Sequence, residues 1–154
     1  MKKIIAVFIA ASTIMGVEAS QAAMSSTTTF NLTSHATGAG VTMASNMKMG
    51  GATSGSADGH FVIDLKKNTL CYTVMTKGLT NVVEAHIHTG AIGMDGADVI
   101  SLLPTKFNKK LATCIKSTAT LLGTISTTPA NYYLNVHTKK YPDGAVRAQL
   151  VAVR

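Results

Sequence analysis

The chain has 154 residues, of which 14% are charged and 5% aromatic, and its formal net charge at pH 7 is +7. That length suits one domain built around a single hydrophobic core. The lysines lie mainly in adjacent pairs at predicted turns and lack the interleaved aromatic residues of nucleic-acid binders, so we expect no nucleic-acid partner.

Residues 1–22 have the features of an export signal. Residues 2–3 are lysines, residues 4–15 form an apolar run, and the small side chains of Ser20 and Ala22 provide a cleavage site. The apolar run is too short to span a bilayer, which favours a cleaved signal over the alternative of an uncleaved N-terminal membrane anchor. The sequence therefore predicts a signal peptide over residues 1–22.

The predicted mature domain, residues 23–154, carries a net charge of +6, because the signal takes away two lysines and one glutamate. No further apolar stretch is long enough to cross a membrane, so we expect no transmembrane segment and a periplasmic or secreted location. In such an oxidising compartment an even number of cysteines favours a disulfide between Cys71 and Cys114 over two free thiols. Their spacing matches no zinc-ribbon or CxxC redox motif.

Short segments rich in Val, Ile, Thr and Tyr recur along the mature chain, separated by Gly, Asn, Asp and Pro, and no window shows sustained helical periodicity. We therefore predict an all-β, single-domain antiparallel β-sandwich or barrel. Residues 66–68 and 141–144 have the composition of tight turns. The predicted strands are residues 27–34, 60–64, 69–76, 82–89, 98–103, 119–124, 132–138 and 145–153.

Residues 38–59 hold six of the 13 glycines and many small polar residues, which predicts a long loop or a weak edge strand. Three methionines in this segment, Met43, Met47 and Met49, have thioether groups that could bind Cu(I). The alternative, that they fill gaps between apolar side chains, is the one we favour.

The polar residues that could carry chemistry lie in the predicted strands 82–89, 132–138 and 145–153. Side chains alternate between the two faces of a strand, so each of these strands has one polar and one apolar face. If the apolar face of each strand packs on the core, the polar faces together form one outer surface. The residues predicted on this surface are Glu84, His86, His88, Asn135, His137, Arg147 and Gln149.

Three histidines on this surface form a candidate metal site. His86 and His88 have Cα atoms about 6.5 Å apart along one strand, and His137 on a neighbouring strand would complete the set. Neutral imidazole binds copper and zinc well, and three ligands leave one position open. The alternative is that the histidines only form hydrogen bonds that brace the sheet. Arg147 is predicted to clamp a carboxylate such as Glu84.

Two motifs in this chain resemble the CHRD (chordin-type) domain of exported bacterial proteins. The likeness extends over residues 27–151, and it departs from the family pattern at Ala148 and at residues 34–36. The resemblance implies an immunoglobulin-like or superoxide-dismutase-like β-sandwich, but it implies no activity. The motifs are Ala85-His86-Ile87-His88 with Gly90, Gly93 and Gly96, and residues 133–138 with Pro142, Gly144 and residues 147–150.

The sequence does not predict an enzyme. It has no nucleophile, paired-carboxylate or phosphate-binding motif, and a dismutase would need a fourth copper ligand and a separate zinc site. We expect an exported CHRD-like binding module with a surface metal site for copper or zinc, in which Glu84, Asn135, Arg147 and Gln149 have structural roles. The alternative is an interaction or adhesion module of the cell envelope or extracellular matrix, with another protein as its partner.

Overall fold

The computed structural model describes residues 27–41, 50–102, 107 and 109–154. The predicted signal peptide and the three methionines of the 38–59 segment lie outside the described residues. No helix within the described part of the chain is long and apolar enough to cross a membrane.

The described residues form nine strands, all paired antiparallel, which confirms the all-β prediction. The strands follow the order β5-β4-β7-β8-β1-β2-β3-β6, with β9 beside β1. Two short 3-10 helices lie at Gly38–Gly40 and Pro129–Asn131. The main elements are β1 (Thr29–Thr37), β2 (Ser56–Asp64), β3 (Thr69–Lys77), β4 (Val82–Thr89), β5 (Asp98–Ser101), β6 (Lys110–Lys116), α1 (Ala119–Thr127), β7 (Tyr132–Thr138), β8 (Val146–Gln149) and β9 (Val151–Ala152).

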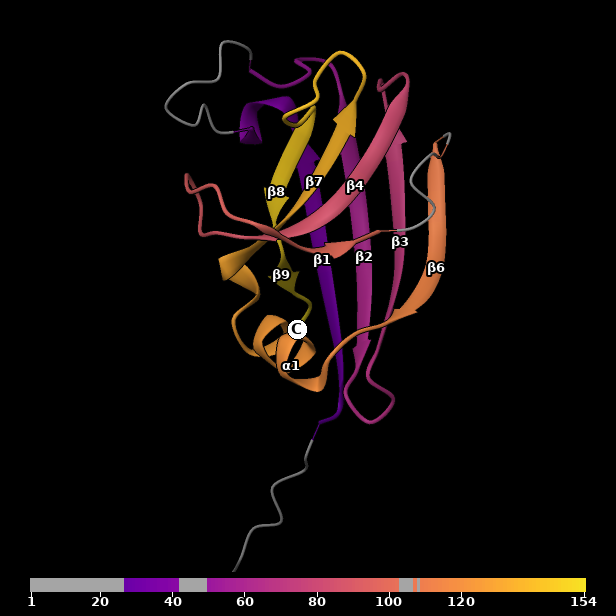
Figure 1. Cartoon of the computed structure of the whole chain (residues 1–154), viewed down its shortest axis with the longest axis vertical. Coiled ribbons are helices and arrows are strands. Elements are labelled where there is room, and N and C mark those ends of the chain that lie inside the picture. The colour runs from indigo at the N-terminus through magenta and orange to yellow at the C-terminus, as the bar shows by residue number, and fades with distance from the viewer. Residues whose placement is uncertain (1–26, 42–49, 103–106, 108) are drawn as a thin grey trace, which may run out of the picture.

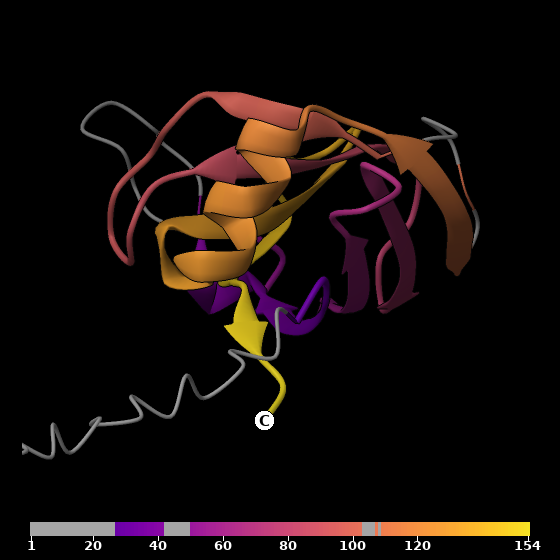
Figure 2. The ribbon, with the colours of Figure 1, turned by 90° about the horizontal axis from the view of Figure 1, so that it is seen from below.

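The sheet curls into two facing layers, a sandwich-like arrangement visible in Figure 1 and, from below, in Figure 2. One layer contains β5, β4, β7 and β8, and the other contains β1, β2, β3 and β6. The layers join at a corner where β1 pairs with β8 through Thr37 and Arg147. Helix α1 lies across the end of the sandwich that is lowest in Figure 1.

Alternate residues of the strands in both layers fill the core, as expected because successive side chains of a strand point to opposite faces. Phe61 and Val74 belong to one layer and Ile87 and Leu134 to the other, and all four are buried in the same apolar cluster. In β4 and β8 the intervening residues point away from this cluster. The candidate site residues therefore lie on the face opposite the core, as their sequence parity predicts.

Two features of the fold differ from the predicted strands. Residues 119–124 were expected to be a strand but belong to helix α1, whose first turn is capped where the Thr118 hydroxyl accepts a hydrogen bond from the Leu121 amide. Leu122 and Ile125 are buried at a helical spacing of three. Strand β6 was not predicted, because only Leu111 within it is buried and an edge strand shows little apolar alternation.

Strand β2 begins at Ser56, four residues before the predicted strand, so residues 56–59 belong to an interior strand between β1 and β3 and not to the loop or edge strand expected for residues 38–59. The remaining strand boundaries are close to those expected. The segment 145–153 is divided at Leu150 into β8 and β9, and β1 extends beyond residue 34 to Thr37. The predicted strand 98–103 is β5, which ends at Ser101. The predicted turn at residues 66–68 connects β2 to β3.

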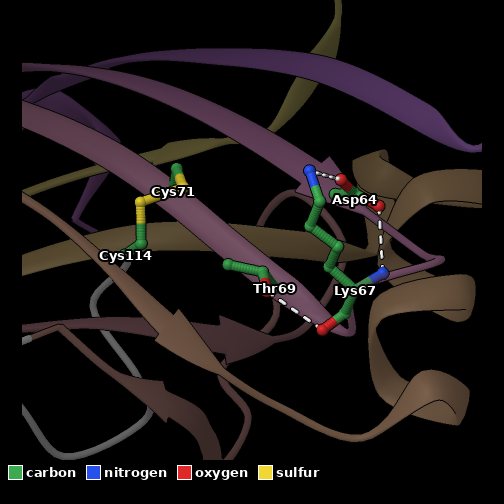
Figure 3. The surroundings of a disulfide bond; sticks show 5 residues. All are labelled: Asp64, Lys67, Thr69, Cys71 and Cys114. Atoms are coloured by element: carbon green, nitrogen blue, oxygen red, sulfur yellow. Dashed lines mark hydrogen bonds and ion pairs between the residues drawn. A yellow bond between two sulfur atoms is a disulfide. The ribbon is translucent and has the colours of Figure 1, made fainter.

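The predicted disulfide is confirmed, since Cys71 and Cys114 are directly opposite each other on β3 and β6 and are bonded (Figure 3). The bond attaches the edge strand β6 to its neighbour β3. Near it, Lys67 closes the β2–β3 turn, with its Nζ 3.0 Å from Asp64 Oδ2 and its backbone amide donating to Asp64 Oδ1.

Candidate metal site

The register between β4 and β7 brings His86, His88 and His137 together. Glu84 is opposite His137, and His86 is opposite Asn135, so His86 and His137 are diagonal neighbours on one face. One potential ligand atom from each histidine lies within 4.8 Å of the others. The three histidines that were singled out from strand parity could therefore hold a metal ion together.

Backbone carbonyls fix which nitrogen carries the proton in two of these imidazoles. His88 Nδ1 lies 3.0 Å from the Gly96 carbonyl oxygen, and His137 Nδ1 lies 2.8 Å from that of Pro142. A carbonyl oxygen can only accept, so each Nδ1 carries the hydrogen and donates it. The Nε2 atoms of His88 and His137 are then unprotonated and each carries a lone pair, as in metal sites whose histidine ligands are oriented by a carbonyl.

The potential ligand nitrogens lie close together within the cluster. His86 Nδ1 lies 3.3 Å from His137 Nε2, while His88 Nε2 is buried and has no hydrogen-bond partner. Two nitrogens bound at 2.0–2.1 Å to one tetrahedral zinc ion are about 3.3 Å apart. The spacing of His86 and His137 thus fits a shared ion, and so does the unpaired nitrogen of His88.

Electrostatics keep these imidazoles neutral. Burial lowers the pKa of His86 below its usual 6.5, and the nearby His88 lowers it further, whereas Glu84 acts in the opposite direction. Burial is also the main cause of the lowered pKa of His88 and of His137. Neutral imidazole is the form that binds metal, so the site needs little deprotonation at pH 7.

The site is only partly open to solvent, which corrects the expected solvent-exposed outer face: Glu84 is exposed and His86 and His88 are half-buried. His137, Asn135 and Arg147 are buried, and every residue of β7 is buried although only one of its faces meets the core. The loop of residues 90–97 folds back over this face, with the Gly96 amide 3.3 Å from the Tyr133 hydroxyl. The turn of residues 139–145 contributes the Pro142 carbonyl.

Arg147 holds the covering loop in place. Its Nη1 lies 2.6 Å from Asp95 Oδ1, and its Nη2 donates to the carbonyl oxygens of Met94 and Ala91. The prediction that Arg147 pairs with a carboxylate is confirmed, but the carboxylate is that of Asp95 and not that of Glu84. Glu84 instead lies 4.0 Å from His86, through Oε2 and Nε2.

A stack of side chains links Arg147 to the histidines. The Arg147 guanidinium lies 3.5 Å from the centre of the Tyr133 ring. That ring stacks on His88, with centroids 5.0 Å apart and planes 11° from parallel. Arg147 therefore affects His88 through the ring stack and also through the loop that supplies the Gly96 carbonyl.

The two amide side chains on this face have different roles. Gln149 Nε2 donates to the carbonyl oxygens of Gly90 and Ala130, both at 2.8 Å, and so fixes the start of the covering loop. Asn135 Nδ2 lies 3.4 Å from the Asp143 carbonyl, while its Oδ1 is buried without a partner. Gly144 passes so close that a Cβ there would be 2.6 Å from Asn135 Oδ1.

A cavity of about 300 Å³ adjoins His88 and His137. Sequence reasoning did not identify Asp95 or Tyr133 as parts of this site. Tyr133 alternates in step with Asn135 and His137 along the strand, and this alternation could have identified it. Asp95 lies in a loop, and strand alternation does not predict the path of a loop. The lining of the cavity includes His88, His137, Asn135, Arg147, Asp95 and Asp143.

The remaining described histidines form no comparable group. His35 and His60 are exposed on the other layer, where His35 Nδ1 lies 2.5 Å from Asp58 Oδ1. These two side chains provide matched controls for the partly buried cluster.

Comparison with known proteins gave one finding. The model of the CHRD domain matches residues 32–150, a range that includes His86, His88, His137 and Arg147. Neither the curated proteins nor the solved structures gave a match. The candidate site thus lies wholly within the matched region.

Proposed function

The chain belongs to the CHRD-domain family, and from this starting point we propose that it is an exported binding module for one divalent metal ion, copper or zinc. The ligands would be Nε2 of His88, Nε2 of His137 and Nδ1 of His86. The observation that carries the proposal is the buried Nε2 of His88, which has a lone pair and no partner.

That nitrogen separates metal binding from simple bracing. A structural histidine in a sheet has hydrogen-bond partners for its buried nitrogens, because an unpaired buried polar atom costs about 1–3 kcal/mol. His137 meets this expectation at both nitrogens, through Pro142 and His86. His88 does not. A cation at the centre of the cluster satisfies all three imidazoles at once.

The donor set favours copper or zinc. Both cysteines are in the disulfide, so the candidate ligands are borderline imidazole nitrogens rather than thiolates. When bound, such an ion supplies a Lewis acid next to the cavity. The residues of the chain would hold it, and Gly96 and Pro142 would orient its ligands through their carbonyls.

Export is part of the same proposal. The disulfide supports an oxidising compartment, and residues 1–22 have the pattern of a cleaved signal. Mass spectrometry of the protein from its native compartment should give an N-terminus near Ala23. An N-terminus at Met1 would contradict cleavage.

One observation favours the alternative of an interaction module with a protein partner in the envelope or matrix. Ile92 and Met94, on the loop that covers the site, are 86% and 62% exposed. Apolar side chains at a loop tip can bury area against another protein. In that case the histidines would only support the loop.

Calorimetric titration of Cu(II) and Zn(II) into the purified mature protein distinguishes the two proposals. We expect one ion per chain, and we expect His86→Ala, His88→Ala and His137→Ala each to weaken affinity strongly. The exposed His60→Ala is the matched control and should bind as the wild type does. A triple variant that binds as tightly as the wild type, or a wild type with no binding below about 10 μM, would leave the interaction module as the function.

A further inference from the structure

Five exposed lysines form a basic end of the sandwich, on segments that are far apart in the sequence. The β3–β4 connection and the β7–β8 turn both lie at the top of Figure 1, opposite helix α1, and β6 begins beside the end of β3. Backbone hydrogen bonds join these segments, since the Lys139 amide donates to the Asn81 carbonyl oxygen at 3.1 Å and the Thr76 amide donates to that of Lys109 at 2.7 Å. The basic end consists of Lys77, Lys109, Lys110, Lys139 and Lys140.

No lysine of the basic end is paired with a carboxylate in the part of the chain that the structure describes. Lys140 Nζ lies 5.2 Å from the centre of the Tyr141 ring, a contact that attracts the cation but does not neutralise it. Residues 77–81, 109–110 and 139–143 together contain the five lysines and one acidic residue, and so have a net charge of +4. This end therefore presents positive charge to an anionic partner.

The opposite end of the sandwich has three exposed lysines, but two of them have partners. Lys67 Nζ lies 3.0 Å from Asp64 Oδ2, and Lys116 Nζ donates to the Lys67 carbonyl oxygen at 2.6 Å. The third is Lys66. Positive charge without a partner is therefore concentrated at the basic end.

A polar cavity of about 200 Å³ lies among the same segments. Its walls are close together, because a Cβ on Gly78 would lie 2.4 Å from the Ser54 carbonyl oxygen. Each hydroxyl in the lining can both donate and accept a hydrogen bond, and Lys140 adds a cation. The lining residues with hydroxyl groups are Thr53, Ser54, Thr80, Thr138 and Tyr141.

An acidic polysaccharide fits both features of this end. Its carboxylate or sulfate groups would pair with the lysines, and its sugar hydroxyls would exchange hydrogen bonds with the hydroxyls of the cavity. A membrane surface fits less well, because none of the exposed large apolar side chains of the described residues lies on the three lysine-bearing segments. A single-stranded nucleic acid also fits less well, because its bases bind by stacking and Tyr141 is the only aromatic residue on those segments.

We propose that the basic end binds an acidic polysaccharide, with the lysines on its anionic groups and the polar cavity on the hydroxyls of one sugar unit. None of the three histidines of the candidate metal site lines this cavity. The proposal therefore goes beyond metal binding and does not depend on it. The domain would attach to a carbohydrate of the envelope or matrix through this end.

The test titrates heparin, which is sulfated, and polygalacturonate, which is carboxylated, into the mature protein at about 0.15 M salt with a chelator present. We expect at least one of the two to bind, with an affinity that falls as the salt concentration rises. Neutral dextran should not bind. A wild-type protein that binds neither acidic polysaccharide would overturn the proposal.

A variant in which Lys77, Lys139 and Lys140 are all changed to alanine should bind about 100-fold more weakly, since each lysine near an anionic surface contributes roughly fivefold to affinity. The matched control removes the same charge from the opposite end by changing its three lysines, residues 66, 67 and 116, to alanine. It should stay within about twofold of the wild type, because salt screens charges that are more than about 8 Å from the ligand.

All six substituted side chains are exposed, so both triple variants should keep the wild-type urea midpoint. Equal losses of affinity in the two variants would assign binding to the overall net charge and overturn the basic end as a binding surface. Vesicles of phosphatidylglycerol or duplex DNA that bind as tightly as the polysaccharide would overturn the choice of partner.

Discussion

The outer faces of the two layers have the same alternating sequence pattern but very different environments. On the face of β4, β7 and β8, the polar residues Asn135, His137 and Arg147 are buried. On the face of β2, β3 and β6, His60 is exposed, and Val62 and Met75 are among the exposed large apolar side chains. One face is a polar network that is partly covered, and the other is an open surface.

The connections between strands account for this difference. β2 and β3 are joined by a tight turn at residues 65–68, which is too short to fold back over the face of the sheet. β4 and β5 are joined by residues 90–97, which fold back over their own layer and are held by Arg147 and Gln149. Buried polar groups need hydrogen-bond partners, so covering this face required a connected set of polar side chains. The following predictions test how independent the two faces are.

The largest expected effect belongs to the open face. Replacing Cys71 and Cys114 together by serine should lower the free energy of unfolding by about 4 kcal/mol, because the unfolded chain regains the entropy of a long loop. The metal affinity should not change, since the disulfide joins β3 to β6 in the other layer. Urea unfolding and metal titration measure the two quantities. A parallel loss of affinity would show that the faces are coupled.

The next effect belongs to the covered face. Arg147→Lys should lower the free energy of unfolding by about 2 kcal/mol, because an ammonium group cannot reproduce the fork that holds Asp95 and the loop carbonyls. It should also weaken metal binding, since the loop supplies the Gly96 carbonyl to His88. Lys77→Ala, at the exposed end of β3 on the open face, is the control and should stay within about 0.5 kcal/mol of the wild type. An unchanged melting temperature for Arg147→Lys would contradict the proposed role of the clamp.

Acid should act through the covered face. Burial lowers the pKa of His86, His88 and His137 in the folded protein, so below about pH 6.5 the unfolded chain binds more protons than the folded chain. In the presence of a chelator, stability should therefore fall as the pH drops through 6.5 and level off below the folded pKa values. Urea midpoints between pH 7.5 and pH 5 measure this, and a variant with all three histidines changed to asparagine should lose that part of the dependence. Equal slopes in both proteins would contradict it.

Tyr133→Phe should have the smallest effect. The hydroxyl that meets the Gly96 amide is lost, which costs about 1 kcal/mol, while the ring remains between His88 and Arg147. Metal affinity should fall only slightly. Tyr133→Leu, which also removes the aromatic ring, is the comparison and should weaken binding further. If the two variants bind metal equally, the ring stack contributes nothing to the site.

Strand parity predicted which residues share a face, because the period of two is a property of every extended backbone. It placed His86, His88 and His137 on one face, and the structure brings them together. The burial of that face could not be predicted in this way. It depends on the path of residues 90–97, and Asp95, the partner of Arg147, lies in that loop, where no periodicity applies.

The helix and the edge strand were missed for a related reason. Helix α1 contains threonines and an isoleucine, which favour strands. The segment is helical because a helix lets Leu122 and Ile125 both pack into the core. Strand β6 has one buried side chain, so its place depends on pairing with β3 and on the disulfide. Both elements are determined by tertiary contacts rather than by local preference.

The corner where the two layers meet has a consequence for folding kinetics. Strand β1 pairs with β2, its next strand along the chain, but also with β8 and β9 near residues 147–152. Folding rates fall as the mean sequence separation of contacting residues rises, and a chain made from its N-terminus cannot close this corner until β8 and β9 are available. Until then, β1 has one unpaired edge. The rate-limiting step should therefore be the docking of the last two strands, and truncation before Val151 should slow refolding of a chain whose other strands are intact.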